Sequence, residues 1–280
     1  MSVQAGIGSS RNYIPDVFAL LRLAVAQFFR PPSNPRRHEA ARRLLRQVVL
    51  LTGIGAVVVI ALMFAFDAFE IGLMPKRGSP DLWPVRILTD FAKDAFVLGL
   101  LAGMLLIVAL MAPRWQGPQR ARLLAFGTRL QFVFFAVLTP VLAGELIKFV
   151  VGRGRPFVGG SANAFNFEPF NGTEAHFSFP SAHAITGFAL AFAVAALWPR
   201  ARGVMIVYAL AIAASRLVLL AHHPSDVVAG ALIGVIGAMA VRYWFAARRL
   251  GFVIRGNGEI APLTGRLPRL KRVARTPSAP

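Results

Sequence analysis

The chain has 280 residues, of which 56% are hydrophobic and only 15% charged, and its mean hydropathy is +0.60. This balance excludes an ordinary soluble domain of this length and predicts an integral membrane protein. The formal net charge of +19 is typical of a nucleic-acid-binding protein, but the Lys and Arg residues lie between hydrophobic runs, as topology signals do, so no nucleic acid is expected as a partner. The absence of cysteine excludes disulfides and thiolate metal sites.

The N-terminal segment 1–47 precedes the first long hydrophobic run and is expected to be cytoplasmic. From Val17 onward apolar residues recur at helical spacing, with Arg22 on the opposite side. This pattern predicts an amphipathic helix on the membrane surface. A poorly ordered N-terminus fits the same residues. A proline-rich stretch at 31–35 ends any helix that forms here.

Six hydrophobic runs follow, each near the ~20 residues that a helix needs to cross a bilayer. They cover residues 48–66, 91–112, 130–150, 182–198, 203–221 and 227–245. We therefore predict an all-α fold, a polytopic bundle of six transmembrane helices at 48–246, followed by a basic, disordered cytoplasmic tail at 247–280.

The basic residues set the orientation of this bundle. Of the 31 Lys and Arg residues, 23 lie in the terminal segments and in the loops on the same side. By the positive-inside rule, we expect both termini on the cytoplasmic side of the membrane. The opposite ends of the six helices then face the periplasm or the exterior.

Three polar clusters stand at these outer helix ends. They are Lys148 with Arg155-Pro156 after six residues, then Pro180-Ser181-Ala182-His183, and then Ser215-Arg216 with His222 and Asp226. An ionisable residue at a membrane helix is costly, so each is a candidate functional residue. Lys148, Arg155 and Arg216 bring three cations to one surface. Such a set suits an anion with several equivalent oxygens, and phosphate is the natural candidate.

Two of the clusters contain helix-start signals. Ser181 precedes an apolar run, so we expect it to cap a helix. The free N–H groups at the start of such a helix also bind phosphate. A capping role alone explains the serine at this position equally. His222 and Asp226 are four residues apart and share a face if this turn is helical. A carboxylate beside one ring nitrogen fixes the tautomer and leaves the other nitrogen as nucleophile or base. His223 is interpreted as a bystander.

Other charged residues near the outer ends have simpler interpretations. Asp90 and Asp94, with Lys93 between them, are interpreted as a charge cluster at a helix start, and no metal site is predicted there. Glu145 lies one turn before Lys148. It either orients Lys148 for function or forms a purely structural ion pair with it.

The outer loop and the later spans carry two further signals. The loop 157–179 contains five phenylalanines beyond its first residue, and it either closes over a lipid chain or packs on the bundle. Gly230 and Gly234 are four residues apart, and Ala238 continues this spacing, which predicts close packing of helices within the chain.

The three clusters resemble the signature of the type 2 phosphatidic acid phosphatase, or lipid phosphate phosphatase, superfamily. That signature is a Lys, six residues and Arg-Pro; a Pro-Ser-Gly-His; and a Ser-Arg, five residues, His, three residues and Asp. Segments 148–156 and 215–226 match it in full. The middle element differs at Ala182, which replaces glycine and adds one methyl group at a helix start. The motifs cover 148–226, and the six-span layout extends the resemblance over most of the chain.

The resemblance implies a mechanism. His222 attacks phosphorus to form a phosphohistidine while Asp226 holds its ring, and His183 protonates the departing oxygen and later activates water. The phosphate-binding residues that it implies are Lys148, Arg155, Ser181 and Arg216. No metal and no cofactor is expected, because these cations take the part of a divalent ion.

From these motifs we predict a metal-independent histidine phosphatase that acts on a lipid phosphate or diphosphate at the outer face of the cytoplasmic membrane. The leading substrate is undecaprenyl diphosphate. Lipid A 1-phosphate, phosphatidylglycerophosphate and phosphatidic acid stay open, because the motifs recognise only phosphate. The alternatives are a lipid phosphotransferase and a non-catalytic lipid-binding or transporting protein, and the complete set of histidines and cations disfavours the latter. The expected partners are the lipid substrate and the bilayer.

Overall fold

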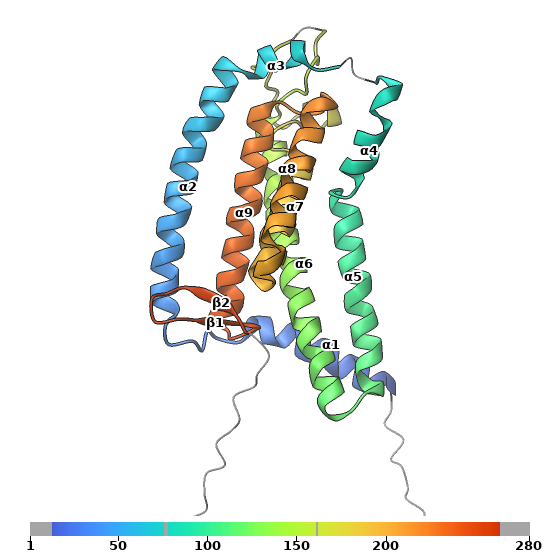
Figure 1. Cartoon of the computed structure of the whole chain (residues 1–280), viewed down its shortest axis with the longest axis vertical. Helices are drawn as coiled ribbons and strands as arrows, with labels where there is room; N and C mark the ends of the chain where they lie inside the picture. Colours follow the sequence, from blue (N-terminus) through green and yellow to red (C-terminus); the bar gives the residue numbers. More distant parts are fainter. Residues whose placement is uncertain (1–12, 76–77, 161, 264–280) are drawn as a thin grey trace, which may run out of the picture.

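A computed structural model describes residues 13–75, 78–160 and 162–263. Long helices run side by side, with a transverse helix and a β-hairpin at one end and irregular loops at the other (Figure 1). We call the end with the transverse helix and the hairpin the basic end. The opposite end, which carries segments 152–181 and 219–223, is called the loop end.

The helices of this described part follow one another in simple order. They are α1 (Tyr13–Phe29), α2 (Arg37–Ala65), α3 (Asp67–Leu73), α4 (Trp83–Asp90), α5 (Asp94–Met111), α6 (Gly117–Val151), α7 (Ala182–Leu197), α8 (Arg202–Val218) and α9 (Pro224–Ala247). Single 3₁₀ turns lie at Pro80–Leu82, Ala112–Arg114, Glu174–His176 and Pro199–Ala201. Two short strands, β1 (Phe252–Ile254) and β2 (Ile260–Pro262), follow α9.

Within the described ranges, five helical segments are long and apolar enough to cross a membrane. They are Arg37–Ala65, Pro80–Arg114, Gly117–Val151, Pro199–Val218 and Pro224–Ala247. The remaining predicted span corresponds to α7, an apolar helix of 16 residues, which is roughly 24 Å long at 1.5 Å per residue. The chain is thus a mostly helical, polytopic membrane protein, as predicted, with five candidate spans among the described residues. The sixth expected span, α7, stays a prediction.

The short helix α7 lies at the centre, in contact with α6, α8 and α9. Glycines allow α9 to approach it closely. A Cβ atom on Gly234 would lie only 2.4 Å from the carbonyl oxygen of Ile185, and one on Gly230 only 2.5 Å from that of Ser181. Small residues let helix backbones meet in this way. The predicted close packing within the chain is therefore confirmed, and it places the start of α7 against the start of α9.

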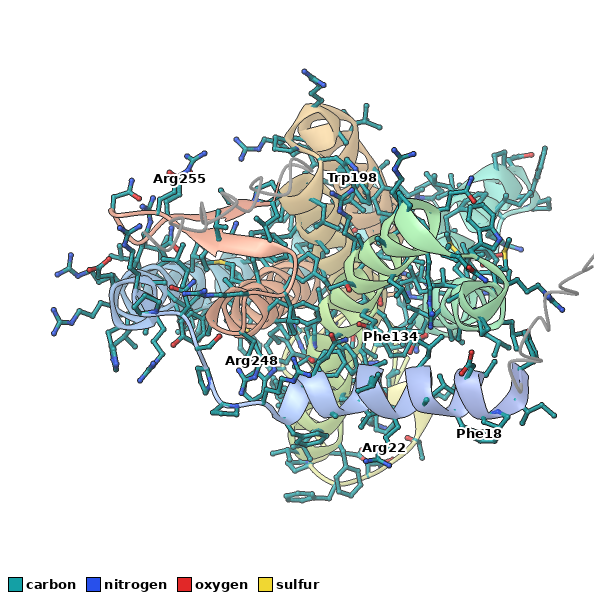
Figure 2. The ribbon with its side chains drawn as sticks, turned by 90° about the horizontal axis from the view of Figure 1, so that it is seen from below. Phe18, Arg22, Phe134, Trp198, Arg248 and Arg255 are labelled. Carbon is teal, nitrogen blue, oxygen red and sulfur yellow. The ribbon has the colours of Figure 1, made fainter. Side chains whose placement is uncertain are left out.

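Helix α1 lies across the basic end of the bundle (Figures 1 and 2). The predicted helix is therefore present. Its large apolar side chains at Ile14, Phe18, Leu21, Val25 and Phe29 are all exposed and share one face. Figure 2 shows Phe18 and Arg22 on the side turned away from the bundle. On the inner side, Phe28 packs edge-on against Phe135, with ring centroids 4.7 Å apart. Arg22 thus lies on the same side as Phe18 and not, as the sequence pattern had predicted, on the side opposite the apolar residues (Figure 2). A helix with an exposed apolar face across the end of a bundle is typical of the membrane interface.

The segment after α9 differs from the disordered tail that we predicted for 247–280. Strands β1 and β2 form an antiparallel hairpin, in which Phe252 pairs with Pro262. Phe252 and Ile254 are buried, and Phe252 packs against Phe132 with ring centroids 4.7 Å apart. A short run of strand-forming apolar residues before an Asn-Gly pair is a hairpin signal that outweighs the basic composition here. Residues 264–280, like 1–12, lie outside the described residues.

Candidate active site

All the predicted site residues lie at the loop end, on the four helices that surround or include α7. Lys148 lies in the last turn of α6, and Arg155 follows just beyond that helix. Ser181 and His183 lie at the start of α7. Arg216 lies in the last turn of α8, and the start of α9 separates His222 from Asp226. His183 interacts electrostatically with Arg216, Lys148, Lys93 and Arg155, and His222 with Arg216, Arg155 and His183. The structure therefore brings the three sequence clusters into one site.

A glycine at the end of α6 directs the chain into this site. Gly152 has a φ of 57°, and its N–H donates to the carbonyl oxygen of Lys148 at 2.9 Å. A Cβ atom there would overlap the backbone of Glu168 at 1.8 Å. Glycine adopts this left-handed conformation at low cost and ends helices for that reason. The turn sends the next residue, Arg153, inward.

Arg153 forms the buried centre of the site, although its spacing did not single it out. Its side chain is fully buried. Nη1 donates to Oδ1 of Asp226 and to Oγ of Ser225, both at 2.6 Å, and Nη2 donates to Oδ2 of Asp67 at 2.8 Å. Nε and Nη2 also donate to the carbonyl oxygen of Ala164. One guanidinium thus bridges two buried carboxylates.

Asp67 extends this network to the outer end of the first long helix. It is the first residue of α3 and is fully buried. Its Oδ1 accepts from the N–H of Ser225 at 3.0 Å. The sequence offered only weak signals that Arg153 and Asp67 belong to the site. Arg153 lies among the six residues between Lys148 and Arg155, and Asp67 is the first acidic residue after the first hydrophobic run. Neither position shows from sequence that the two side chains meet.

The ring of His222 is held by a backbone carbonyl. Nδ1 lies 2.8 Å from the carbonyl oxygen of Ser178. Oδ2 of Asp226 is 4.0 Å from the same nitrogen, and it accepts instead from Oγ of Ser178 at 2.6 Å and from the N–H of His223 at 2.9 Å. Asp226 therefore contacts the ring through Ser178, and not by the direct hydrogen bond that the motif implied.

The reason for this difference is where α9 begins. The helix starts at Pro224, so His222 precedes it and does not share a helical face with Asp226. The carbonyl of Ser178 can only accept, so Nδ1 carries the hydrogen and Nε2 keeps its lone pair in the neutral ring. Burial, and then the charges of Arg216 and Arg155, hold the pKa of His222 well below its usual range. A neutral ring with one free nitrogen is suited to nucleophilic attack.

Several polar atoms around this ring have no hydrogen-bond partner among the described residues. They are Oγ of Ser181, Nε2 of His183 and Nε of Arg216. Ser181 is the N-cap residue of α7, but its side chain forms no capping hydrogen bond. Buried polar atoms are nearly always satisfied in folded proteins. Together with the free N–H groups of the first turn of α7, these atoms can accommodate an oxyanion.

The cations are oriented by neighbouring side chains. Nζ of Lys148 donates to Oε1 of Glu145 at 2.5 Å, and Nη1 of Arg216 donates to Oγ1 of Thr89 at 2.7 Å. Glu145 thus pairs with Lys148, as both interpretations of the sequence required. Asp90 forms an exposed ion pair with Lys93 at 2.8 Å.

The outer loop 157–179 lies over the same end of the bundle and contributes to the site through its backbone. The N–H of Arg155 donates to the carbonyl oxygen of Ala175 at 2.9 Å. Phe165 and Phe170 are exposed, yet each ring also contacts a ring of a long helix, Phe64 and Phe149 respectively. These contacts support the interpretation that the loop packs on the bundle, while part of each ring remains exposed to the surroundings.

Residues 129–250 match the family model of the PAP2 superfamily. Two curated relatives are lipid A 1-phosphatases, from Rhizobium johnstonii (37% identical over 49% of this chain and 56% of that protein) and from Rhizobium etli (35% identical, 49% and 58%). A third is the bacitracin transport permease protein BcrC of Bacillus licheniformis (33% identical, 43% and 58%). The matches thus span little more than half the length of these relatives. No solved structure matches the chain significantly.

The matched segment contains every predicted site residue, from Lys148 to Asp226, whereas Asp67 lies before it. The resemblance inferred from the three motifs is therefore confirmed by an independent match over the same residues. Residues 129–250 thus identify a domain of the PAP2 superfamily, that of the type 2 phosphatidic acid phosphatases, in this chain.

Proposed function

We propose that this protein is a lipid phosphatase that works through a phosphohistidine formed at His222. The observation that carries the proposal is the state of this ring. Nδ1 donates to the carbonyl oxygen of Ser178, and burial together with two arginines holds the pKa of His222 low. The free Nε2 is then available as a nucleophile at neutral pH.

In the first step, the lone pair of Nε2 attacks phosphorus, the bond from phosphorus to the lipid oxygen breaks, and His183 gives that oxygen a proton. The negative charge of the bound phosphate favours the proton on His183, which otherwise lies among cations. Water then attacks the phosphohistidine and loses its proton to His183. The N–P bond breaks, phosphate leaves, and both histidines return to their starting states.

The phosphoryl oxygens are bound by Lys148, Arg155, Arg216 and the Ser181 region. These groups stabilise the charge that develops in the transition state, which is the main contribution a protein makes to phosphoryl transfer. In this scheme they take the place of a metal ion. Asp226, Arg153 and Asp67 act as positioning residues, because they fix Ser178 and through it the ring of His222.

The first substrate to test is the 1-phosphate of lipid A, because the two Rhizobium relatives carry that name. Undecaprenyl diphosphate, the leading substrate in the sequence analysis, is the second. Both present a phosphate at the end of a membrane lipid. The site residues recognise only this shared group, so the choice between the two depends on contacts with the rest of the lipid.

The activity is tested by phosphate release from detergent-solubilised protein in EDTA. The substrates are lipid A 1-phosphate, undecaprenyl diphosphate, phosphatidylglycerophosphate and phosphatidic acid. We expect metal-free release, fastest from lipid A 1-phosphate, and none from His222→Ala. The control His38→Ala, an exposed histidine at the basic end, keeps full activity. Equal release by wild type and His222→Ala refutes the nucleophile, and loss of substrate without free phosphate identifies a phosphotransferase.

We further propose that the loop end faces the periplasm and the basic end the cytoplasm of an inner membrane. The distribution of Lys and Arg along the sequence supports this orientation. The chain has no cysteine, so single cysteines at Asn171 and at Arg200, both exposed, report on the two sides. A membrane-impermeant maleimide added to spheroplasts should label Asn171→Cys only. Labelling of Arg200→Cys alone reverses the orientation.

A further inference from the structure

An apolar cavity of about 260 Å³ lies between α7, α8 and α9, in the half of the bundle next to the basic end. None of the active-site residues lines it. The cavity exists because the side chains facing it are short: Ala191, Ala195 and Ala196 come from α7 and Ala209 from α8. Helix α8 packs mainly on α7 and only slightly on α9, so a space remains between the three helices.

Two guanidinium groups line the same cavity. Arg202 is the first residue of α8, and Arg242 lies in the last two turns of α9, so both are near the basic end. Cζ of Arg242 lies 4.9 Å from the centroid of the Phe192 ring. Its Nε has no hydrogen-bond partner in the part of the chain that the structure describes. An unsatisfied guanidinium nitrogen beside an apolar cavity is a binding feature that packing alone does not explain.

The charges near the cavity leave an excess of positive charge. Among the residues that the structure describes, no acidic side chain lines it. On its other side, Arg242 shares a smaller cavity with Arg43 and Glu259. Glu259 is already paired with Arg255 at 3.0 Å, so it compensates only part of the charge of Arg43 and Arg242. The arginines therefore remain available to an anion.

We propose that this cavity binds one acyl chain of an anionic phospholipid from the leaflet at the basic end, with the lipid phosphate between Arg202 and Arg242. The helical segments Pro199–Val218 and Pro224–Ala247, which contain α8 and α9, are long enough to cross a membrane, so the apolar space lies at acyl-chain depth and the arginines at headgroup depth. Its volume is just below the ~300–1,000 Å³ of typical small-molecule sites, which suits a single chain. The site is separate from the proposed catalytic site, at the opposite end of α7, and does not depend on that function.

The experiment is a titration of delipidated protein with phosphatidylglycerol or phosphatidylcholine, with bound lipid counted by native mass spectrometry. We expect wild type to prefer phosphatidylglycerol. Each arginine near an anionic headgroup contributes about fivefold to the affinity. We therefore expect the double variant Arg202→Ala/Arg242→Ala to bind phosphatidylglycerol on the order of 20-fold more weakly than wild type. The charge-matched control Arg30→Ala/Arg200→Ala removes two exposed arginines from the same end and should keep the preference. Thermal unfolding in detergent reports whether each variant is folded, independently of the proposed catalytic function.

A second variant tests the apolar part without changing charge. Ala195→Phe places a ring in the cavity and should lower the affinity for both lipids. The proposal is overturned if wild type binds the two lipids equally, if the control loses as much affinity as the Arg202/Arg242 variant, or if Ala195→Phe binds like wild type. It is also overturned if inorganic phosphate alone binds at the two arginines as tightly as the lipid.

Discussion

Replacing Arg153 by methionine tests the buried network around the ring of His222, the proposed nucleophile. The change removes the only side chain that, in the described part, donates to both Asp67 and Asp226, and it leaves two carboxylates without a cation in a fully buried site. Removing one partner of a buried ion pair costs about 3–5 kcal/mol. For a chain of this size each kcal/mol lowers the melting temperature by about 2–4 °C, so we expect a decrease of roughly 6–20 °C.

The measurement combines thermal unfolding in detergent with phosphate release at a temperature where both proteins are folded. We expect Arg153→Met to lose most of kcat as well, because Asp226 and Ser178 then no longer fix the ring of His222. Arg86→Met is the matched control: this exposed arginine at the same end of the bundle should change the melting temperature by less than about 2 °C. If Arg153→Met melts like the control and keeps wild-type kcat, the network neither stabilises the protein nor positions the ring.

Three further changes test other parts of the structure. Ser178→Ala removes the hydroxyl that donates to Asp226 but keeps the carbonyl; kcat should fall about tenfold, the equivalent of one hydrogen bond, with KM unchanged, and a change in KM alone would contradict this role. Burial, and then a neighbouring carboxylate, raise the pKa of Glu70 to about 7, so the folded state holds a proton that the unfolded state has released, and stability is lost as pH rises from about 4.5 through 7. Glu70→Gln should therefore raise the melting temperature at pH 8 and leave it nearly unchanged at pH 4.5, and equal shifts at both would refute the assignment. Gly234→Ala places a Cβ against the backbone of α7 and should destabilise by about 1–3 kcal/mol, whereas Gly99→Ala, with open space around it, should be neutral or slightly stabilising in the same unfolding assay.

Local patterns in the sequence were sufficient to predict the class of the protein and the place of its motifs. Runs of apolar residues predicted helices wherever long helices form, because hydropathy over about 20 residues decides which segments enter a bilayer. The order of these runs also placed the motifs around Lys148, His183 and His222 at one end. Helical periodicity predicted α1, and glycine spacing predicted that the helix now seen as α9 packs closely within the chain, without naming its partner α7. The superfamily followed from the same motifs.

Local patterns were misleading where two signals competed in one segment. The tail after α9 is rich in basic residues and proline, which predicted disorder, yet its apolar residues at 252 and 254 are buried in a hairpin against Phe132. The four-residue spacing of His222 and Asp226 predicted a shared face on the condition that their turn is helical, and the condition fails because Pro224 begins the helix between them. In each case burial or a helix boundary decided the outcome, and composition or spacing did not.

The sequence by itself determined which segments form long apolar helices and which basic and histidine side chains cluster near their ends, because both depend on residue type and short-range spacing. Only the tertiary structure decided how the ring of His222 is held. Arg153 meets Asp67, 86 positions earlier, and Asp226, 73 positions later, and Asp226 bonds to Ser178 where a direct bond to His222 was expected. Such pairings arise where α3, the segment after α6, and the start of α9 pack together. A buried charge must find its partner across that contact, and no single stretch of the chain contains both sides of it.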